Sequence, residues 1–134
     1  MGDEAVITWK INKHTNRNLC LDLFFSFQQR LQEKKEDFWQ KYHTTPFFRA
    51  SINEGRIVMS TVGELKTEIV YHGDVLNTAA RIQSLCKTYD TALLISENFY
   101  EKINDKKIFQ FKCFSNIAIT GKDEKINIYS VNRN

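Results

Sequence analysis

Proline and glycine are scarce in this sequence, which holds one proline and five glycines among its 134 residues. Long flexible linkers and low-complexity tails are usually rich in these residue types, so we expect neither here. The remaining composition, with 42% hydrophobic and 26% charged residues, is ordinary for a globular domain. A chain of this length is expected to form one domain and to bury a sizeable core.

Cysteine is also sparse, with three residues that stand far apart: Cys20, Cys86 and Cys113. The odd number and wide spacing argue against a disulfide framework, and no Cys or His residues have the spacing of a zinc site. Each cysteine has apolar neighbours in the sequence. We therefore expect three buried, reduced thiols in a cytoplasmic protein.

No apolar run approaches the length of about 20 residues that a membrane-spanning helix needs, and no signal peptide is visible. We expect this segment to make no membrane contact. The formal net charge of +3 is small and evenly spread, so we expect no nucleic-acid binding either. An RNA-binding module would need Phe109, Phe111 and Phe114 exposed on a basic sheet face, whereas we expect these residues in the core.

Hydrophobic periodicity and turn residues predict a mixture of strands and helices. The predicted elements are a strand over 5–11, a helix of about six turns over 19–42 capped by Asn16 or Asn18, extended runs over 47–52 and 56–61, a helix from 74 to about 89, a strand over 93–95, a helix over 97–103 capped by Ser96, and a final hairpin of 109–119 and 126–131. We expect Gly55 to supply a positive φ between the two extended runs. This order indicates an α+β fold with helices packed on one face of the sheet.

The helix that begins at Asp74 separates its residues onto two faces. At about 100° per residue, one narrow apolar stripe should point to the core and comprises Val75, Ala79, Ile82 and Cys86. Asn77 and Arg81 fall on the opposite face, one turn apart. An amide and a guanidinium directed outward suit an anionic ligand or a partner surface, although an ordinary exposed pair has the same spacing.

The wider segment around this pair, from Tyr71 to Arg81, reads YHGDVLNTAAR. It resembles the signature helix of the class III nucleotide cyclases, the adenylate and guanylate cyclases. Two further segments are similar to hairpins of that family: RASINEGRIV, from Arg49 to Val58, and the stretch from Ile117 to Val131. The resemblance implies a ferredoxin-like cyclase fold with a mostly antiparallel sheet. It also implies that residues 1–134 are the later part of a catalytic domain whose first strand and helices lie upstream.

The resemblance implies roles for individual residues. In the family an asparagine orients the ribose and an arginine stabilises the triphosphate in the transition state, which assigns these roles to Asn77 and Arg81. Asp3, in a Gly-Asp turn before an apolar run, is similar to the second of two aspartates that bind two Mg²⁺ or Mn²⁺ ions. Val70 stands at a base-selecting position. The family's phosphate-contacting lysine matches Thr120 here, and the resemblance offers Lys122, two residues further on, as its substitute. The family's site forms between two protomers, so a homodimer is implied.

The implied function is the cyclisation of ATP to a 3′,5′-cyclic nucleotide with release of pyrophosphate, and GTP is the alternative substrate. Because the first metal-binding carboxylate should lie upstream of Met1, we expect this chain to be inactive alone. The alternative is a degenerate cyclase-like domain that binds nucleotide or a partner without catalysis and serves regulation. An aspartate and a base-selecting lysine upstream of Met1 in the parent protein would favour the enzyme.

Overall fold

In the computed structural model of this chain, the described residues are 5–8, 10–55, 74–119 and 124–134. Their helices and strands are α1 (Asn18–Glu33), α2 (Lys35–Tyr42), β1 (Ala50–Ile52), α3 (Asp74–Ser84), β2 (Leu93–Ser96), α4 (Glu97–Glu101), β3 (Phe109–Ala118) and β4 (Lys125–Arg133). Helices and strands mix along the chain without a regular βαβ alternation. The predicted α+β class is therefore confirmed.

The strands form one four-stranded sheet in the order β1-β2-β4-β3. β1 and β2 run parallel, whereas β4 is antiparallel to both β2 and β3. Most of the pairing is thus antiparallel, as predicted. The β3–β4 hairpin has a register shift between Phe114 and Ile117, where Asn116 adopts a left-handed φ of 56°. An irregularity of this kind bends the strand locally.

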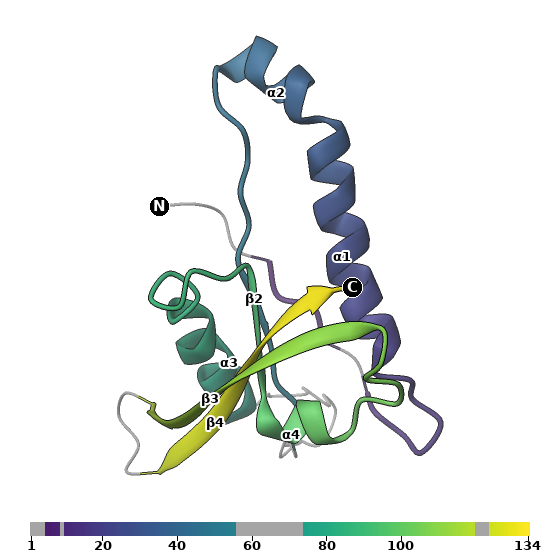
Figure 1. Ribbon diagram of the computed structural model, residues 1–134, viewed down its shortest axis with the longest axis vertical. Coiled ribbons are helices and arrows are strands. Elements are labelled where there is room, and N and C mark those ends of the chain that lie inside the picture. The colour runs from purple at the N-terminus through teal and green to yellow at the C-terminus, as the bar shows by residue number, and fades with distance from the viewer. Residues whose placement is uncertain (1–4, 9, 56–73, 120–123) are drawn as a thin grey trace, which may run out of the picture.

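Helices cover both faces of the sheet, so the prediction that they pack on one face is wrong (Figure 1). Leu93 and Ile95 of β2 point to the side on which α1 and α4 pack, and Leu94 between them points to α3. Alternate side chains of a strand point to opposite faces. All four residues of β2 are buried, and a continuous apolar run of this kind is typical of a strand covered on both sides.

The first half of α1 is fixed to the body of the domain by polar and apolar contacts. The Asn18 side chain donates to the Asp105 carbonyl oxygen at 2.7 Å and accepts from the Asp105 backbone N–H at 2.9 Å. The Asn16 side chain accepts from the Asn18 backbone N–H at 3.0 Å. The N-cap itself is Arg17 and has no side-chain cap hydrogen bond, so the predicted cap by Asn16 or Asn18 is wrong. The buried Phe25 ring stacks on Phe109, with 5.7 Å between the ring centroids.

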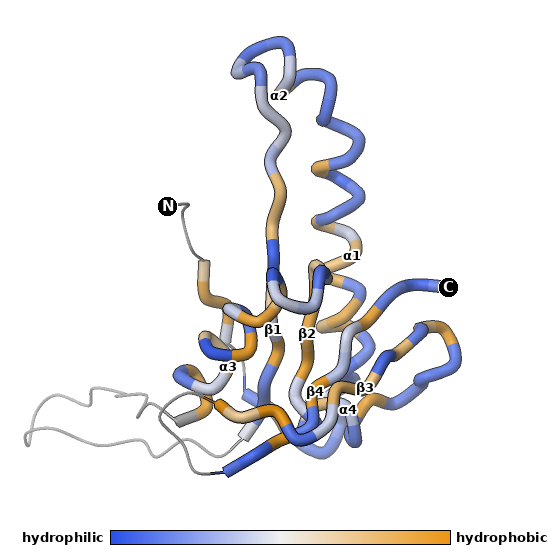
Figure 2. The backbone as a smooth tube through the Cα atoms, turned by 60° about the vertical axis from the view of Figure 1, so that its left-hand side comes forward, coloured by the Kyte–Doolittle hydropathy of each residue, from blue (hydrophilic) through white to orange (hydrophobic). Residues whose placement is uncertain are grey.

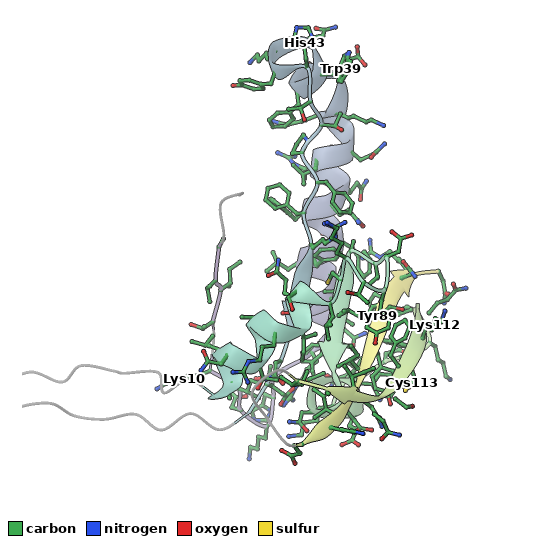
Figure 3. The ribbon with its side chains drawn as sticks, turned by 90° about the vertical axis from the view of Figure 1, so that its left-hand side faces the viewer. Lys10, Trp39, His43, Tyr89, Lys112 and Cys113 are labelled. Atoms are coloured by element: carbon green, nitrogen blue, oxygen red, sulfur yellow. The ribbon has the colours of Figure 1, made fainter. Side chains whose placement is uncertain are left out.

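Beyond Phe25 the helix leaves the body and continues as an arm that ends in α2 (Figure 1). The predicted single helix is wrong at Lys34, where a turn separates α1 from α2. The residues around this turn are charged and unpacked, so no apolar face holds the two helices in line. α2 has no buried residue, and the arm is mostly hydrophilic towards its end (Figure 2). Trp39 and His43 contact each other edge to face at the tip, far from the sheet (Figure 3).

Four predictions for the extended segments and the turn between them are wrong or remain open. Where the structure describes the predicted strand over 5–11, the residues are exposed, have no regular secondary structure and pair with no strand of the described sheet. Unpaired backbone does not hold a strand conformation in water. In the predicted run over 47–52 only Ala50–Ile52 forms a strand, and the run over 56–61 lies outside the described residues. The φ of Gly55 is not in the left-handed region, so the predicted positive φ is wrong.

The elements of the second half follow the predictions more closely. α3 ends at Ser84, about one turn earlier than predicted, because the next residue closes a tighter turn: the Leu85 N–H donates to the Ile82 carbonyl oxygen at 3.0 Å. β2, α4 and the β3–β4 hairpin are confirmed. The Ser96 hydroxyl accepts from the Phe99 N–H at 3.2 Å and caps α4, as predicted.

The cysteines differ in their surroundings. Cys20 and Cys86 are buried as predicted, but Cys113 is exposed. Cys113 lies on β3, which is one of the two edge strands of the described sheet, and an edge strand has a neighbouring strand on one side only (Figure 3). On the same strand Phe109, Phe111 and Phe114 pack into the core clusters, as expected.

Candidate functional site

α3 presents the two faces that its periodicity predicts. Ile82 and Cys86, which follows the end of the helix, are fully buried in a cluster with Leu94 of β2. Val75 and Ala79, earlier on the same face, are half-buried. The apolar stripe therefore faces the core, and the opposite side of α3 is turned away from the sheet.

Asn77 and Arg81 lie on that opposite side. Asn77 is exposed and Arg81 is half-buried. The helix rises by about 6 Å between them, so both side chains can reach one ligand. Within the described part of the chain, neither side chain has a hydrogen-bond or ion-pair partner. An amide and a guanidinium in this arrangement can bind the oxygen atoms of an anion.

Strand β1 holds the first half of α3 through its side chains. The Ser51 hydroxyl donates to the Ala79 carbonyl oxygen at 2.5 Å, and Nδ2 of Asn53 donates to the Val75 carbonyl oxygen at 3.1 Å. Gly55 lies against the same turn, since a Cβ added there would stand 2.9 Å from Cγ2 of Val75. The close approach requires glycine because the side chain of valine is short and stiff. None of these contacts was predicted from the sequence.

The end of α3 and the turn after it donate hydrogen bonds in the opposite sense, to the start of β1 and the residue before it. Nε2 of Gln83 donates to the Arg49 carbonyl oxygen at 3.3 Å, and the Cys86 thiol donates to the Ala50 carbonyl oxygen at 3.4 Å. Burial raises the pKa of Cys86 to about 11, so the thiol keeps the proton that it donates. Helix and strand are thus joined by hydrogen bonds along the length of their contact.

An ion cluster forms around the buried carboxylate of Glu54, just after β1. The Glu54 carboxylate accepts from Nε of Arg17 at 3.1 Å and from Nη2 of Arg17 at 3.0 Å, and Nζ of Lys102 lies 3.7 Å from it. The hydrogen bond to Glu54 raises the pKa of Arg17, which therefore stays charged. Arg17 precedes α1 and Lys102 follows α4, so the cluster joins three parts of the fold. Two cations satisfy this carboxylate, which makes it a structural junction and not a metal ligand.

Three of the predicted site residues, Asp3, Val70 and Lys122, lie outside the described residues. Among the residues that are described, no group of three His, Cys, Asp or Glu side chains could hold a metal ion. These described residues therefore do not form a metal centre by themselves. In the same part of the chain, no helix is both long and apolar enough to cross a membrane.

Comparison with known proteins identifies the family of this chain. A family model described as the adenylate and guanylate cyclase catalytic domain matches residues 1–133. Adenylate cyclase 2 of Rhizobium meliloti (strain 1021) is 27% identical over 131 residues, which cover 98% of this chain and 36% of that protein. An adenylate cyclase of Anabaena cylindrica is 34% identical over 122 residues, which cover 87% of this chain and 24% of that protein.

The matched relatives are much longer than this chain, which spans 36% of the length of the Rhizobium protein and 24% of the Anabaena protein. A terminal-differentiation-specific adenylate cyclase of Dictyostelium discoideum is 34% identical over 82 residues, or 60% of this chain and 4% of that protein. The family match nonetheless extends over nearly every residue here. The chain therefore belongs to the adenylate and guanylate cyclase catalytic domain family.

Proposed function

We propose that the protein to which this chain belongs converts ATP, in preference to GTP, into a 3′,5′-cyclic nucleotide and pyrophosphate. In this reaction the 3′-hydroxyl releases its proton to solvent water and its oxygen attacks the α-phosphorus. The bond from that phosphorus to the bridging oxygen breaks, and pyrophosphate leaves with the electron pair. The observation that carries the proposal is the outward pair Asn77 and Arg81, one turn apart on a helix that the sheet holds in place. Both relatives are named adenylate cyclases, and these names support ATP as the substrate over GTP.

The two side chains suit different parts of the nucleotide. The Arg81 guanidinium has a planar set of donors that matches phosphate oxygens. Its positive charge stabilises the negative charge that develops on the leaving pyrophosphate. The Asn77 amide offers both a donor and an acceptor, which suits the oxygens of the ribose. In the proposal Asn77 orients the sugar and Arg81 stabilises the transition state.

The rest of the proposed site involves residues outside the described ranges. Asp3 would bind Mg²⁺ or Mn²⁺ together with a second carboxylate contributed from elsewhere in the protein, and Lys122 would lie near the phosphates. Two such ions, when bound, neutralise phosphate charge and activate the attacking oxygen. The complete site would form between two copies of the protein. We expect the isolated chain to be inactive, because the resemblance assigns it Asp3 alone as a metal carboxylate.

Production of cyclic nucleotide by the intact protein, supplied with MnATP or MnGTP, tests the proposal. We expect Arg81→Ala to lower kcat by about 100-fold or more, because one donor aimed at developing charge is lost. We expect a smaller change in KM. Arg30→Ala is the matched control, since Arg30 is an exposed arginine on the arm, and it should leave kcat unchanged.

The same assay separates the enzyme from the regulatory alternative. If the intact protein binds ATP but produces no cyclic nucleotide, the hypothesis of an enzyme is rejected in favour of a degenerate regulatory domain. Val70, whose side chain cannot hydrogen-bond a base edge, makes the comparison of ATP with GTP informative, and a clear excess of cyclic GMP would overturn the substrate assignment. Equal turnover by the parent protein and Arg81→Ala would overturn the role of Arg81.

A further inference from the structure

β1 turns polar side chains toward α3 where a contact between a strand and a helix is usually apolar. Ala50 and Ile52 of β1 pack with the cluster on the α1 side. Ser51, between them, points to the other face, where its neighbour in β2 is Leu94 of the α3 cluster. Asn53 continues the same alternation. Both polar residues are half-buried, and both donate to α3.

The two hydrogen bonds from Ser51 and Asn53 end on backbone carbonyl groups of α3 that are one turn apart. They end on the carbonyl oxygens of Val75 and Ala79, which lie on one side of the helix, about 40° apart around its axis. Asn77 lies between these two residues in the sequence, about 160° around the axis from each of them. The side of α3 that accepts these two hydrogen bonds is therefore opposite the side that carries Asn77 and Arg81.

Hydrogen bonds are directional, whereas an apolar contact tolerates small rotations of a helix about its axis. We propose that Ser51 and Asn53 are positioning residues that set the rotation of α3 and thereby the direction of Asn77 and Arg81. The inference rests on the proposed function for what the outward pair does, but the anchoring itself can be measured separately. Neither residue touches substrate in this scheme, since both act through α3.

Matched substitutions at Ser51 test the inference in the intact protein. Ser51→Thr keeps the hydroxyl donor, and Ser51→Val has nearly the same shape without it. We expect Ser51→Val combined with Asn53→Leu to lower kcat about tenfold, because small displacements of catalytic groups are costly. KM and the melting temperature should change little, and Ser51→Thr should retain most of the wild-type kcat. In an Asn77→Ala, Arg81→Ala background the same pair of substitutions should cause no further loss of kcat.

Amide hydrogen exchange measures how firmly α3 is held by these hydrogen bonds, and it does not depend on enzyme turnover. We expect the amides from Asn77 to Arg81 to exchange several-fold faster in Ser51→Val than in Ser51→Thr, because local opening of α3 becomes easier. Equal exchange and equal kcat in these two variants would overturn the inference, as would a kcat loss that persists in the Asn77→Ala, Arg81→Ala background. If the wild-type protein has no turnover but the exchange rates differ, the proposed function fails and only the anchoring stands.

Discussion

Cys86 and Cys113 have the same thiol group in opposite surroundings. Cys86 is fully buried between α3 and the sheet, and this burial raises its pKa to about 11. Cys113 lies exposed on the edge strand, with its Sγ 3.6 Å from the Ser115 hydroxyl. The nucleophilic form of cysteine is the thiolate, and a reagent must also reach the sulfur. Burial therefore decides the reactivity of each residue.

We expect a maleimide reagent at neutral pH to label Cys113 in the folded protein and to label Cys20 and Cys86 only after unfolding in urea. Mass spectrometry of the intact chain gives the number of labels, and peptide mapping gives their positions. Cys113→Ser should remove the label from the folded protein while its circular dichroism spectrum stays unchanged. Labelling of Cys86 as fast as Cys113 under native conditions would contradict the burial of Cys86.

At the scale of elements, β1 is short but has many connections. Its three residues pair with β2. The Ser51 hydroxyl donates a hydrogen bond to α3, and the Glu54 carboxylate just beyond the strand forms an ion pair with Arg17, which precedes α1. Side-chain exposure is 13% for Arg17 and 7% for Glu54, so water screens their attraction poorly. Removing one member of such a pair leaves an uncompensated buried charge.

We expect Glu54→Gln to lower the free energy of unfolding by about 3 kcal/mol, because Arg17 then stays buried beside a neutral amide. Asp22→Asn is the matched control. Its partner is Arg133 at the same distance of 3.0 Å, but the side chains are 40% and 47% exposed. We expect this exposed pair to contribute about 0–1 kcal/mol. Urea unfolding followed by circular dichroism measures both values, and equal losses would contradict the distinction between the two pairs.

At the scale of the whole molecule, helices on both faces of a four-stranded sheet bury groups that are neutral when protonated. Cys86 is buried on the α3 side. Tyr129 packs on the other side, where its ring stacks on Tyr100 with 3.8 Å between centroids. Burial and a hydrogen bond with Cys113 raise the pKa of Tyr129 to about 12. The folded state thus holds these protons more tightly than the unfolded chain does.

We expect the free energy of unfolding to fall as the pH rises from about 9 to about 12, because both groups have unfolded pKa values of about 8.5 to 10. Their stabilising contribution is complete below those unfolded values and is lost as the pH passes through the folded values of about 11 and about 12. Tyr129→Phe should flatten the upper part of this fall, and Cys86→Ala the lower part. Urea midpoints measured at several pH values check the prediction, and slopes unchanged in both variants would contradict it.

The arm was the largest structural feature that sequence periodicity described incompletely. Its apolar residues keep helical spacing through Tyr42, yet α2 buries none of them and the helix is interrupted at Lys34. Helical periodicity shows which residues share a face, but it does not show whether another element covers that face. The strand predicted over 5–11 was wrong for a similar reason, since an apolar run does not show whether another strand lies beside it to pair with.

The sequence by itself determined the elements whose signals are local: the two faces of α3 with Asn77 and Arg81 on one of them, the Ser96 cap, the β3–β4 hairpin and the family. These depend on helical period, on a cap three residues away and on short spacings. The tertiary structure alone decided the coverage of both sheet faces, the exposure of Cys113 and the bonds from Ser51, Asn53 and Glu54. Those features depend on residues far apart in the chain, which only the packed fold brings together.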